Sequence, residues 1–395
     1  MKKYTNSQTK VNNRTLILNI IYNHSDVSRA EIAKITGLTR ATVSDIVAEL
    51  ITEELVLEIG QGQSSGGKPP TLLEVNADAR EILGIDFASN EFRGAIINLR
   101  REIKKGLNFP IHDQSGEDAL NLGFKLIDKL LEISSSPVLG IGIGSPGLLN
   151  TVEGIVRTSV NLGWKDLPLG RILSDRYHLP VCIANDCNVS ALAEHTFRKN
   201  RSSKNLVLIK TGLGVGAGIV LNHKLFYGDG FGAGEIGHVK VEDNGELCAC
   251  GNYGCLETKV SSTAICRRAI HTALEHPGSI LNKNFSNLDD ISIEDVAEAF
   301  RQGDPYIGEI IRDVSKDLSK VLSVIASGLN IQHIVIAGDL SAFGEDLLRF
   351  VTENMKSSVL PAIMQDTKVT ASSMGNEIVM YGAAAMILQH ELGIL

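Results

Sequence analysis

Apolar residues recur at helical spacing in the first fifty positions and predict three short helices. The first covers residues 12–23, with an apolar face made of Leu16, Ile17, Ile20 and Ile21. A second helix opens at Ser28, because Glu31 three positions later completes a capping box. It ends before Gly37, which can take the positive φ of a tight helix end. Thr39 caps a third helix, whose apolar stripe is Val43, Ile46, Val47, Leu50 and Ile51.

A β-hairpin follows the three helices. Residues 55–59 and 71–75 predict two strands around a loop at 60–70 that is rich in glycine, serine and proline. Such a hairpin is a wing, whose tip can reach DNA phosphate or the minor groove, and the start of the third helix is where a major-groove reader carries its base contacts. The candidate DNA-binding residues are Ser28, Arg29, Thr39, Arg40, Ala41, Thr42, Ser44 and Lys68. The alternative is a helical bundle used for dimerisation, but the short turn and the polar wing favour DNA.

Beyond residue 80, apolar runs typical of buried strands alternate with helical segments. The runs cover residues 82–87, 139–143, 181–184, 206–210 and 334–337. Their loops are rich in glycine and aspartate, so we expect an α/β body with its functional site at the strand ends. A long apolar stripe from Ile307 to Ile325 predicts a core helix, with part of it at a dimer interface as the alternative.

Composition and charge narrow the class of protein. Of 395 residues, 43% are hydrophobic and 21% are charged, which excludes a disordered or fibrous chain. Net charge is −8, yet residues 1–48 hold seven basic side chains against three acidic ones, a weak indication of a polyanion-binding head. Because no apolar run could span a bilayer and no signal peptide precedes the first helix, we expect a cytoplasmic protein without membrane insertion. Its six cysteines should then be reduced or bound to metal.

One histidine and three cysteines give the most specific chemical signal. Within 18 residues the chain carries His238, Cys248, Cys250 and Cys255. One imidazole and three thiolates suit a closed tetrahedral zinc site, which leaves no open position for catalysis and is therefore structural. A reduced cysteine cluster without metal is the alternative.

The segments around these residues resemble a known family. Residues 233–238 read AGEIGH and residues 248–257 read CACGNYGCLE, which is similar to the signature of the ROK family of repressors and sugar kinases. With the winged helix, the chain from about residue 12 to its C-terminal helix is similar to the repressor branch. Residues 59–67 are especially similar to the wing of the xylose-responsive members. The resemblance implies an α/β protein, with a winged helix-turn-helix followed by a two-lobed actin-like, ribonuclease H-like sugar kinase fold.

The resemblance also implies a domain organisation and a mode of action. Residues 1–77 would form the DNA-binding domain, residues 78–190 with the C-terminal helix 376–395 the first lobe, and residues 191–375 the second lobe with the zinc site and the dimer interface. A homodimer or tetramer would bind operator DNA and repress carbohydrate-utilisation genes. Sugar in the cleft between the lobes would change the spacing of the paired heads and so their operator affinity. Docking of a sugar-transport protein in place of free sugar is an alternative.

The family implies the sugar-binding residues as well. They are Asn185, Asp186, Glu235, His238 and Glu257, with Asn161 in second rank. Sugar hydroxyls both donate and accept hydrogen bonds, so carboxylates and amides around a ring suit them. The implied effector is of the xylose, glucose or N-acetylglucosamine type, with or without a phosphate group. For any one of these residues, a helix cap or a solvated loop position is the alternative.

Two loops bear on whether the sugar is phosphorylated. In the family's kinases Asp186 would be the general base, and glycine loops hold the ATP phosphates. Residues 211–216 retain one such loop, but residues 86–90 read DFASN where the kinases read Asp-x-Gly-Gly-Thr. Side chains then stand where backbone amides must approach phosphate, and residues 337–340 also depart from the kinases' glycine-rich run. We therefore expect no enzyme, with Asp186 a vestigial base; the alternative is a sugar kinase that phosphorylates a hexose with ATP.

Overall fold

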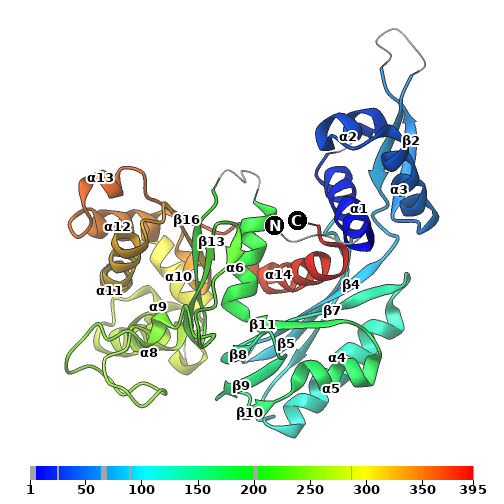
Figure 1. Ribbon diagram of the computed structural model, residues 1–395. Helices are drawn as coiled ribbons and strands as arrows, with labels where there is room; N and C mark the ends of the chain where they lie inside the picture. The colour runs from blue at the N-terminus through cyan, green and yellow to red at the C-terminus, as the bar shows by residue number, and fades with distance from the viewer. Residues whose placement is uncertain are drawn as a thin grey trace. The chain divides into compact units, whose positions relative to one another are not determined.

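A computed structural model describes residues 6–24, 26–63, 69–88, 90–198, 203–285 and 287–394 (Figure 1). The chain forms two compact units. The first comprises Met1–Ala184 and Val379–Leu395, and the second comprises Asn185–Ile378. The first unit therefore contains both the expected winged helix and the expected first lobe, and it ends at residue 184 where the sequence suggested 190.

The N-terminal part of the first unit is a winged helix (Figure 1). Its helices are α1 (Asn6–Asn23), α2 (Arg29–Thr36) and α3 (Arg40–Thr52), and its sheet has the order β1 (Val27–Ser28), β3 (Thr71–Val75), β2 (Val56–Gln61). Ser28 and Glu31 form the capping box of α2, Thr39 caps α3, and Gly37 has a φ of 70°. The predicted helix starts are thus confirmed, because local hydrogen bonds determine them.

A five-stranded sheet forms the body of the first unit. Its order is β11 (Val181–Asn185), β7 (Val138–Ser145), β4 (Glu81–Phe87), β5 (Glu91–Asn98), β6 (Ile103–Pro110), with β4 and β7 parallel. Leu83 and Ile85 of β4 share one core with α4 (Glu117–Ile133) and α5 (Leu169–Tyr177). A small second sheet consists of β8 (Leu148–Asn150), β9 (Ile155–Ser159) and β10 (Trp164–Leu167).

The winged helix and the sheet of the first unit share a second core. Ile82 points to the opposite face from Leu83, as alternate residues of a strand do. It belongs to a buried cluster with Ile17 of α1 and with Leu388, in the π-helical turn Leu388–Leu392 that follows α14 (Ile378–Ile387). Asn19 of α1 also donates a hydrogen bond from Nδ2 to the Gly393 carbonyl at 3.0 Å. The winged helix, called the head below, is therefore packed onto the five-stranded sheet of the first unit and onto the C-terminal segment.

The second unit contains another five-stranded sheet. Its order is β14 (Lys224–Leu225), β13 (Val215–Leu221), β12 (Leu206–Thr211), β15 (His333–Gly338), β16 (Lys368–Ala371). Helix α6 (Asp186–Phe197) covers one face so closely that a Cβ at Gly216 would lie 2.6 Å from the Cys187 sulfur. This packing explains why the second unit begins before α6 and not after it.

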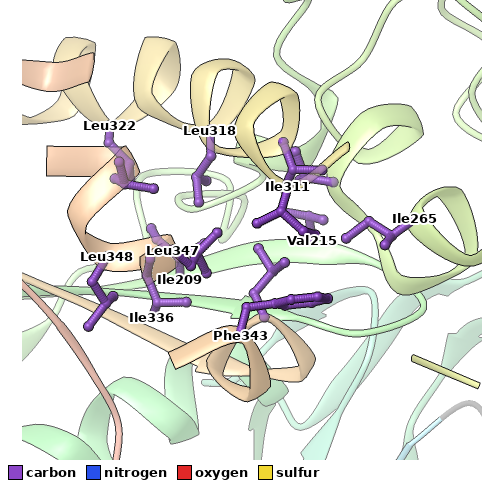
Figure 2. Packing of buried hydrophobic residues seen from close by; sticks show 14 of the residues in the cluster. Ile209, Val215, Ile265, Ile311, Leu318, Leu322, Ile336, Phe343, Leu347 and Leu348 are labelled. Atoms are coloured by element: carbon purple, nitrogen blue, oxygen red, sulfur yellow. The ribbon is translucent and has the colours of Figure 1, made fainter. Parts of the chain in front are cut away.

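Helices cover the other face of this sheet. Figure 2 shows Ile311, Leu318 and Leu322 of α11 (Pro305–Leu329) above Ile209 of β12 and Ile336 of β15. These residues are buried, which confirms that most of the predicted stripe is core. The remaining helices of the unit are α7 (Glu257–Val260), α8 (Ser262–Glu275), α9 (Ile280–Asn284), α10 (Ile293–Arg301), α12 (Gly344–Lys356) and α13 (Pro361–Met364). Among the described residues, no helix is both long and apolar enough to cross a membrane.

Candidate functional site

The four predicted metal ligands converge in the second unit. The ligand atoms of His238, Cys248, Cys250 and Cys255 lie within 4.8 Å of one another. The Cys250 and Cys255 sulfurs are 3.7 Å apart, and the Cys248 sulfur is 3.6 Å from His238 Nδ1. A tetrahedral zinc ion, with Zn–S of about 2.3 Å and Zn–N of about 2.0 Å, requires edges of about 3.8 Å and 3.5 Å. The cluster therefore has the composition and the dimensions of a metal site.

Two of the cysteines are buried in the second unit. Burial raises the pKa of Cys248, and it raises the pKa of Cys255 to about 12. A divalent cation bound at this cluster would lower both pKa values and favour the thiolates. The chain turns between the ligands at Gly251 and Gly254, whose φ values of 89° and 75° suit glycine.

Asn185 and Asp186 lie where β11 meets α6. The Asn185 side-chain oxygen caps α6 by accepting hydrogen bonds from the amides of Cys187 at 2.8 Å and Asn188 at 3.3 Å. Asp186 follows directly, and Lys210 Nζ donates to its Oδ2 at 2.7 Å. Burial alone would raise the pKa of Asp186, but the Lys210 ammonium, together with hydrogen bonds from Cys187, holds the pKa below its usual value. Asp186 is therefore a charged acceptor with a fixed orientation.

Glu235, His238 and Glu257 form the other side of the cluster. His238 Nε2 faces Glu235 Oε2 at 3.8 Å, while its Nδ1 faces the cysteines. Burial raises the pKa of Glu235, and the negative charges of Asp186 and Glu257 raise it further. The neighbouring His238 acts in the opposite direction and lowers it. Glu257 accepts the Val215 amide at 2.9 Å through Oε2, and the Cys248 thiol lies 3.8 Å from its Oε1. Glu257 thus connects the cysteine cluster with the glycine loop.

Five of the six predicted sugar-binding residues lie in the second unit. Electrostatic contacts join Glu235 to Asp186, His238 and Glu257, whereas the Asn185 side chain caps α6. Asn161 is in the first unit, between β9 and β10. Lys210 was not among the predicted residues, because a single lysine at the end of the apolar run 206–210 matches no motif. A charge at the end of a buried strand was the one available signal.

The segments that resemble phosphate loops carry ion pairs and hydrogen bonds of their own. Asp86 is fully buried and pairs with Arg93, its cross-strand neighbour on β5, at 2.7 Å. Ser89, in the same segment, lies outside the described residues. In the second unit, Asp339 accepts a hydrogen bond from the Ser262 hydroxyl, and its carboxylate lies 3.9 Å from the position of a Cβ at Gly212. A carboxylate thus lies beside the glycine loop.

The candidate DNA-binding residues differ in their availability. Arg40, Ala41 and Ser44 are exposed in the first turns of α3, and Thr39 and Thr42 bond each other there at 2.9 Å. Arg29 forms an ion pair with Glu58 of the wing strand β2 at 2.8 Å. Ser28 is 3% exposed and its hydroxyl is used in the capping box, so the structure assigns it a capping role in place of the expected DNA contact. Lys68 lies outside the described residues.

Comparison with known proteins agrees with this arrangement. Residues 82–390 match the ROK family and residues 12–62 match the MarR family. The chain is 31% identical to the xylose repressor of Caldicellulosiruptor bescii over 385 residues, which is 96% of each protein. It is also 31% identical to the glucokinase of Halalkalibacterium halodurans, over 79% of this chain and 96% of that enzyme. A crystal structure of a ROK family transcriptional regulator, a homologue of the E. coli MLC protein, superposes with a TM-score of 0.85 at 29% identity, over 97% of this chain and 96% of that one.

Proposed function

The chain belongs to the ROK family, and from this premise we propose that it is a sugar-responsive transcriptional repressor. One observation carries the proposal. Repressors match the chain over nearly its whole length, whereas the matching glucokinase leaves out a stretch about as long as the winged helix. A winged helix of the MarR type on a sugar kinase-type body supplies both a DNA-reading part and a sugar-sensing part.

We propose that the exposed start of α3 reads the operator. Arg40 can contact a base edge or a phosphate, and the small residues Ala41 and Ser44 allow close approach to the groove. Two winged helices in a dimer would reach half-sites about one DNA turn apart, so a homodimer or a tetramer is the expected assembly. The operator should lie upstream of carbohydrate-utilisation genes.

The effector in this proposal is a sugar of the xylose, glucose or N-acetylglucosamine type, with or without a phosphate group. Asp186 and Glu235 accept hydrogen bonds from its hydroxyls, and Asn185, His238 and Glu257 complete the set, with Asn161 as a further candidate. The ring nitrogen Nδ1 of His238 would serve the metal and Nε2 the sugar side, an arrangement that couples the two. Zn²⁺, bound by His238 and the three cysteines, would supply structural crosslinking and no catalysis.

Phosphoryl transfer has no place in the proposed function. Residues 86–90 carry side chains where glycines would let amides approach phosphate, and Asp86 is already bound to Arg93. The Asp339 carboxylate beside Gly212 opposes a bound nucleotide in the same way. A coupled assay with xylose, glucose or N-acetylglucosamine and ATP should therefore release no ADP.

Fluorescence anisotropy on DNA from the protein's own upstream region tests the proposal. The measurement is made at fixed salt with xylose, glucose, N-acetylglucosamine and their phosphates, because phosphate contacts make the affinity salt-dependent. Tight binding that one sugar reverses supports a repressor and names its effector. Tight binding that no sugar alters would point to a protein partner, and no binding to any fragment together with ADP release would favour the kinase.

A further inference from the structure

Strand β12 carries one charged side chain, Lys210, just before its last residue. Leu206 to Ile209 are buried, and Lys210 follows in the interior of the sheet, opposite Gly216 on β13 and Ala337 on β15. Ile209 faces α11 (Figure 2), so Lys210, the next residue along the strand, points to the face that α6 covers. The small partners Gly216 and Ala337 leave room for a long side chain there.

The lysine meets Asp186 on that face. Its ammonium lies 2.7 Å from Asp186 Oδ2, and the two side chains are only 18% and 16% exposed. A charge enclosed to this degree is costly without a partner, and removal of either member leaves the other uncompensated. The Lys210–Asp186 ion pair is therefore part of the packed interior of the second unit and not a surface contact.

The surroundings of Asp186 are otherwise acidic. Glu235 is near enough that the charges of Asp186 and Glu257 both raise its pKa. The Cys187 thiol, a weak donor, lies 3.7 Å from Asp186 Oδ1. Lys210 is thus the cation that compensates the Asp186 side of the cluster, as His238 faces the Glu235 side.

We propose that Lys210 is a positioning residue of the effector site, which holds Asp186 charged and oriented so that Oδ1 accepts a sugar hydroxyl. This inference rests on the proposed function. Because Lys210 occupies Oδ2, the carboxylate can rotate little, and the hydroxyl meets an acceptor already in place.

The test compares Lys210→Met with Lys210→Arg by titration calorimetry, using whichever sugar of the panel binds the wild-type protein, between pH 5 and pH 8. Any pH dependence of the wild-type affinity should come from Glu235, whose pKa is raised, and not from Asp186, which stays ionised above its lowered pKa. Lys210→Met should bind at least about tenfold more weakly at pH 7, and its affinity should fall more steeply than that of the wild type as the pH falls, since burial and Glu235 then favour protonation of Asp186. Lys210→Arg should restore most of the affinity and the wild-type profile.

A matched control and a mutant cycle complete the test. Lys316→Met removes an exposed lysine from α11 of the same unit and should change nothing. The double variant Asp186→Asn with Lys210→Met should lose little more affinity than Asp186→Asn alone, because the lysine acts through the aspartate. Should Lys210→Met fail to fold, as judged by its melting temperature, Lys210→Gln serves in the same comparison.

The proposed function and the role of Lys210 are refuted by different results. If the wild-type protein binds no sugar of the panel, the proposed function is wrong, and the role of Lys210 with it. If the wild-type protein binds a sugar and Lys210→Met binds it within twofold with the same pH profile, the proposed function stands and the role of Lys210 is refuted. Additive losses in the mutant cycle would also refute it.

Discussion

Asp186 contributes both a charge and a direction, and these can be separated by one substitution. Asp186→Asn keeps the shape of the side chain and removes the charge that a sugar hydroxyl and Lys210 share. Hydrogen bonds to charged groups are roughly twice as strong as neutral ones, so we predict a loss of sugar affinity of about tenfold or more at pH 7. Calorimetry measures it. Asp313→Asn, which removes a 65% exposed carboxylate from α11, is the control, and equal affinities for all three proteins would contradict the assignment.

Two of the DNA-binding candidates in the winged helix, Ser28 and Arg40, should respond to substitution in opposite ways. Ser28→Ala removes the α2 cap, so we predict a destabilisation of about 1 kcal/mol with little change in operator affinity of the folded protein. Thermal unfolding and fluorescence anisotropy separate these effects. A large loss of affinity without loss of stability would restore Ser28 as a DNA contact.

Arg40→Ala should do the reverse. We predict unchanged stability, operator binding weaker by about fivefold or more, and a smaller salt dependence, because an exposed cation at the start of α3 is lost. Lys129→Ala, which removes an exposed lysine from α4, is the matched control. If Arg40→Ala and Lys129→Ala bind DNA equally well, α3 does not read the operator in the proposed way.

Single residues were predictable where a local pattern recorded their role. The metal ligands follow from the spacing of sulfur and imidazole donors, and the caps at Ser28 and Thr39 from the residues two or three positions on. Lys210 and Arg93 were not predictable, because each acts on a carboxylate that another strand or helix supplies. Such pairs depend on sheet register, which no short segment of sequence contains.

The segment with Cys248, Cys250 and Cys255 should stabilise the effector site as well as its own fold. Glu257 links Cys248 to the Val215 amide of the glycine loop, so loss of the metal should displace all three. We predict one zinc per chain by elemental analysis. After chelation, sugar affinity should fall severalfold or more, as calorimetry would measure, while the winged helix keeps its fold, because it belongs to the other unit.

Two cysteine variants test the same element without a chelator. Cys250→Ser removes one ligand and should lose zinc, whereas Cys266→Ser changes a half-buried cysteine that packs against the core and should retain it. Cobalt substitution provides a further check, since tetrahedral sulfur coordination gives an intense visible spectrum only with the intact ligand set. Equal zinc contents in the two variants would exclude the proposed ligand set.

Helices and strands, like single residues, were predictable where nearby residues in the sequence determine them. The strands near residues 82–87, 139–143 and 206–210 and the helix α11 appear where the apolar runs predicted them. The short sheet of β8, β9 and β10 was not foreseen, because these strands are only three to five residues long and partly exposed. Their pairing stabilises them more than their composition does.

At the scale of the whole molecule, the winged helix shares a core with the first lobe. The sequence predicts a domain boundary at residue 77, and across it α1, the sheet of the first lobe and the C-terminal residues pack together in one buried cluster. Nothing local could reveal this, because the contacts join residues near both ends of the chain. Asn19 and Gly393, for example, are bonded across 374 positions.

This shared core predicts that a change at the C-terminus weakens the head. Gly393 has a φ of 63°, and a Cβ there would lie 2.6 Å from Thr15 Cγ2 of α1. Gly393→Ala therefore combines a left-handed backbone penalty of about 1–2 kcal/mol with a clash against the head. We predict faster hydrogen exchange in the amides of α1, α2 and α3 and weaker operator binding.

Gly303→Ala supplies the matched comparison, because it separates backbone strain from the clash. Gly303 also has a positive φ, 83°, but a Cβ there would meet nothing within 4 Å, and it belongs to the second unit. This variant should lose a similar amount of backbone free energy while exchange in the head and operator affinity stay as in the wild type. If Gly393→Ala left the head amides as well protected as Gly303→Ala does, the head would be held by its chain connection alone. A difference confined to Gly393→Ala means that the stability of the DNA-reading part depends on the last residues of the chain, which the core of the sugar-sensing body also contains.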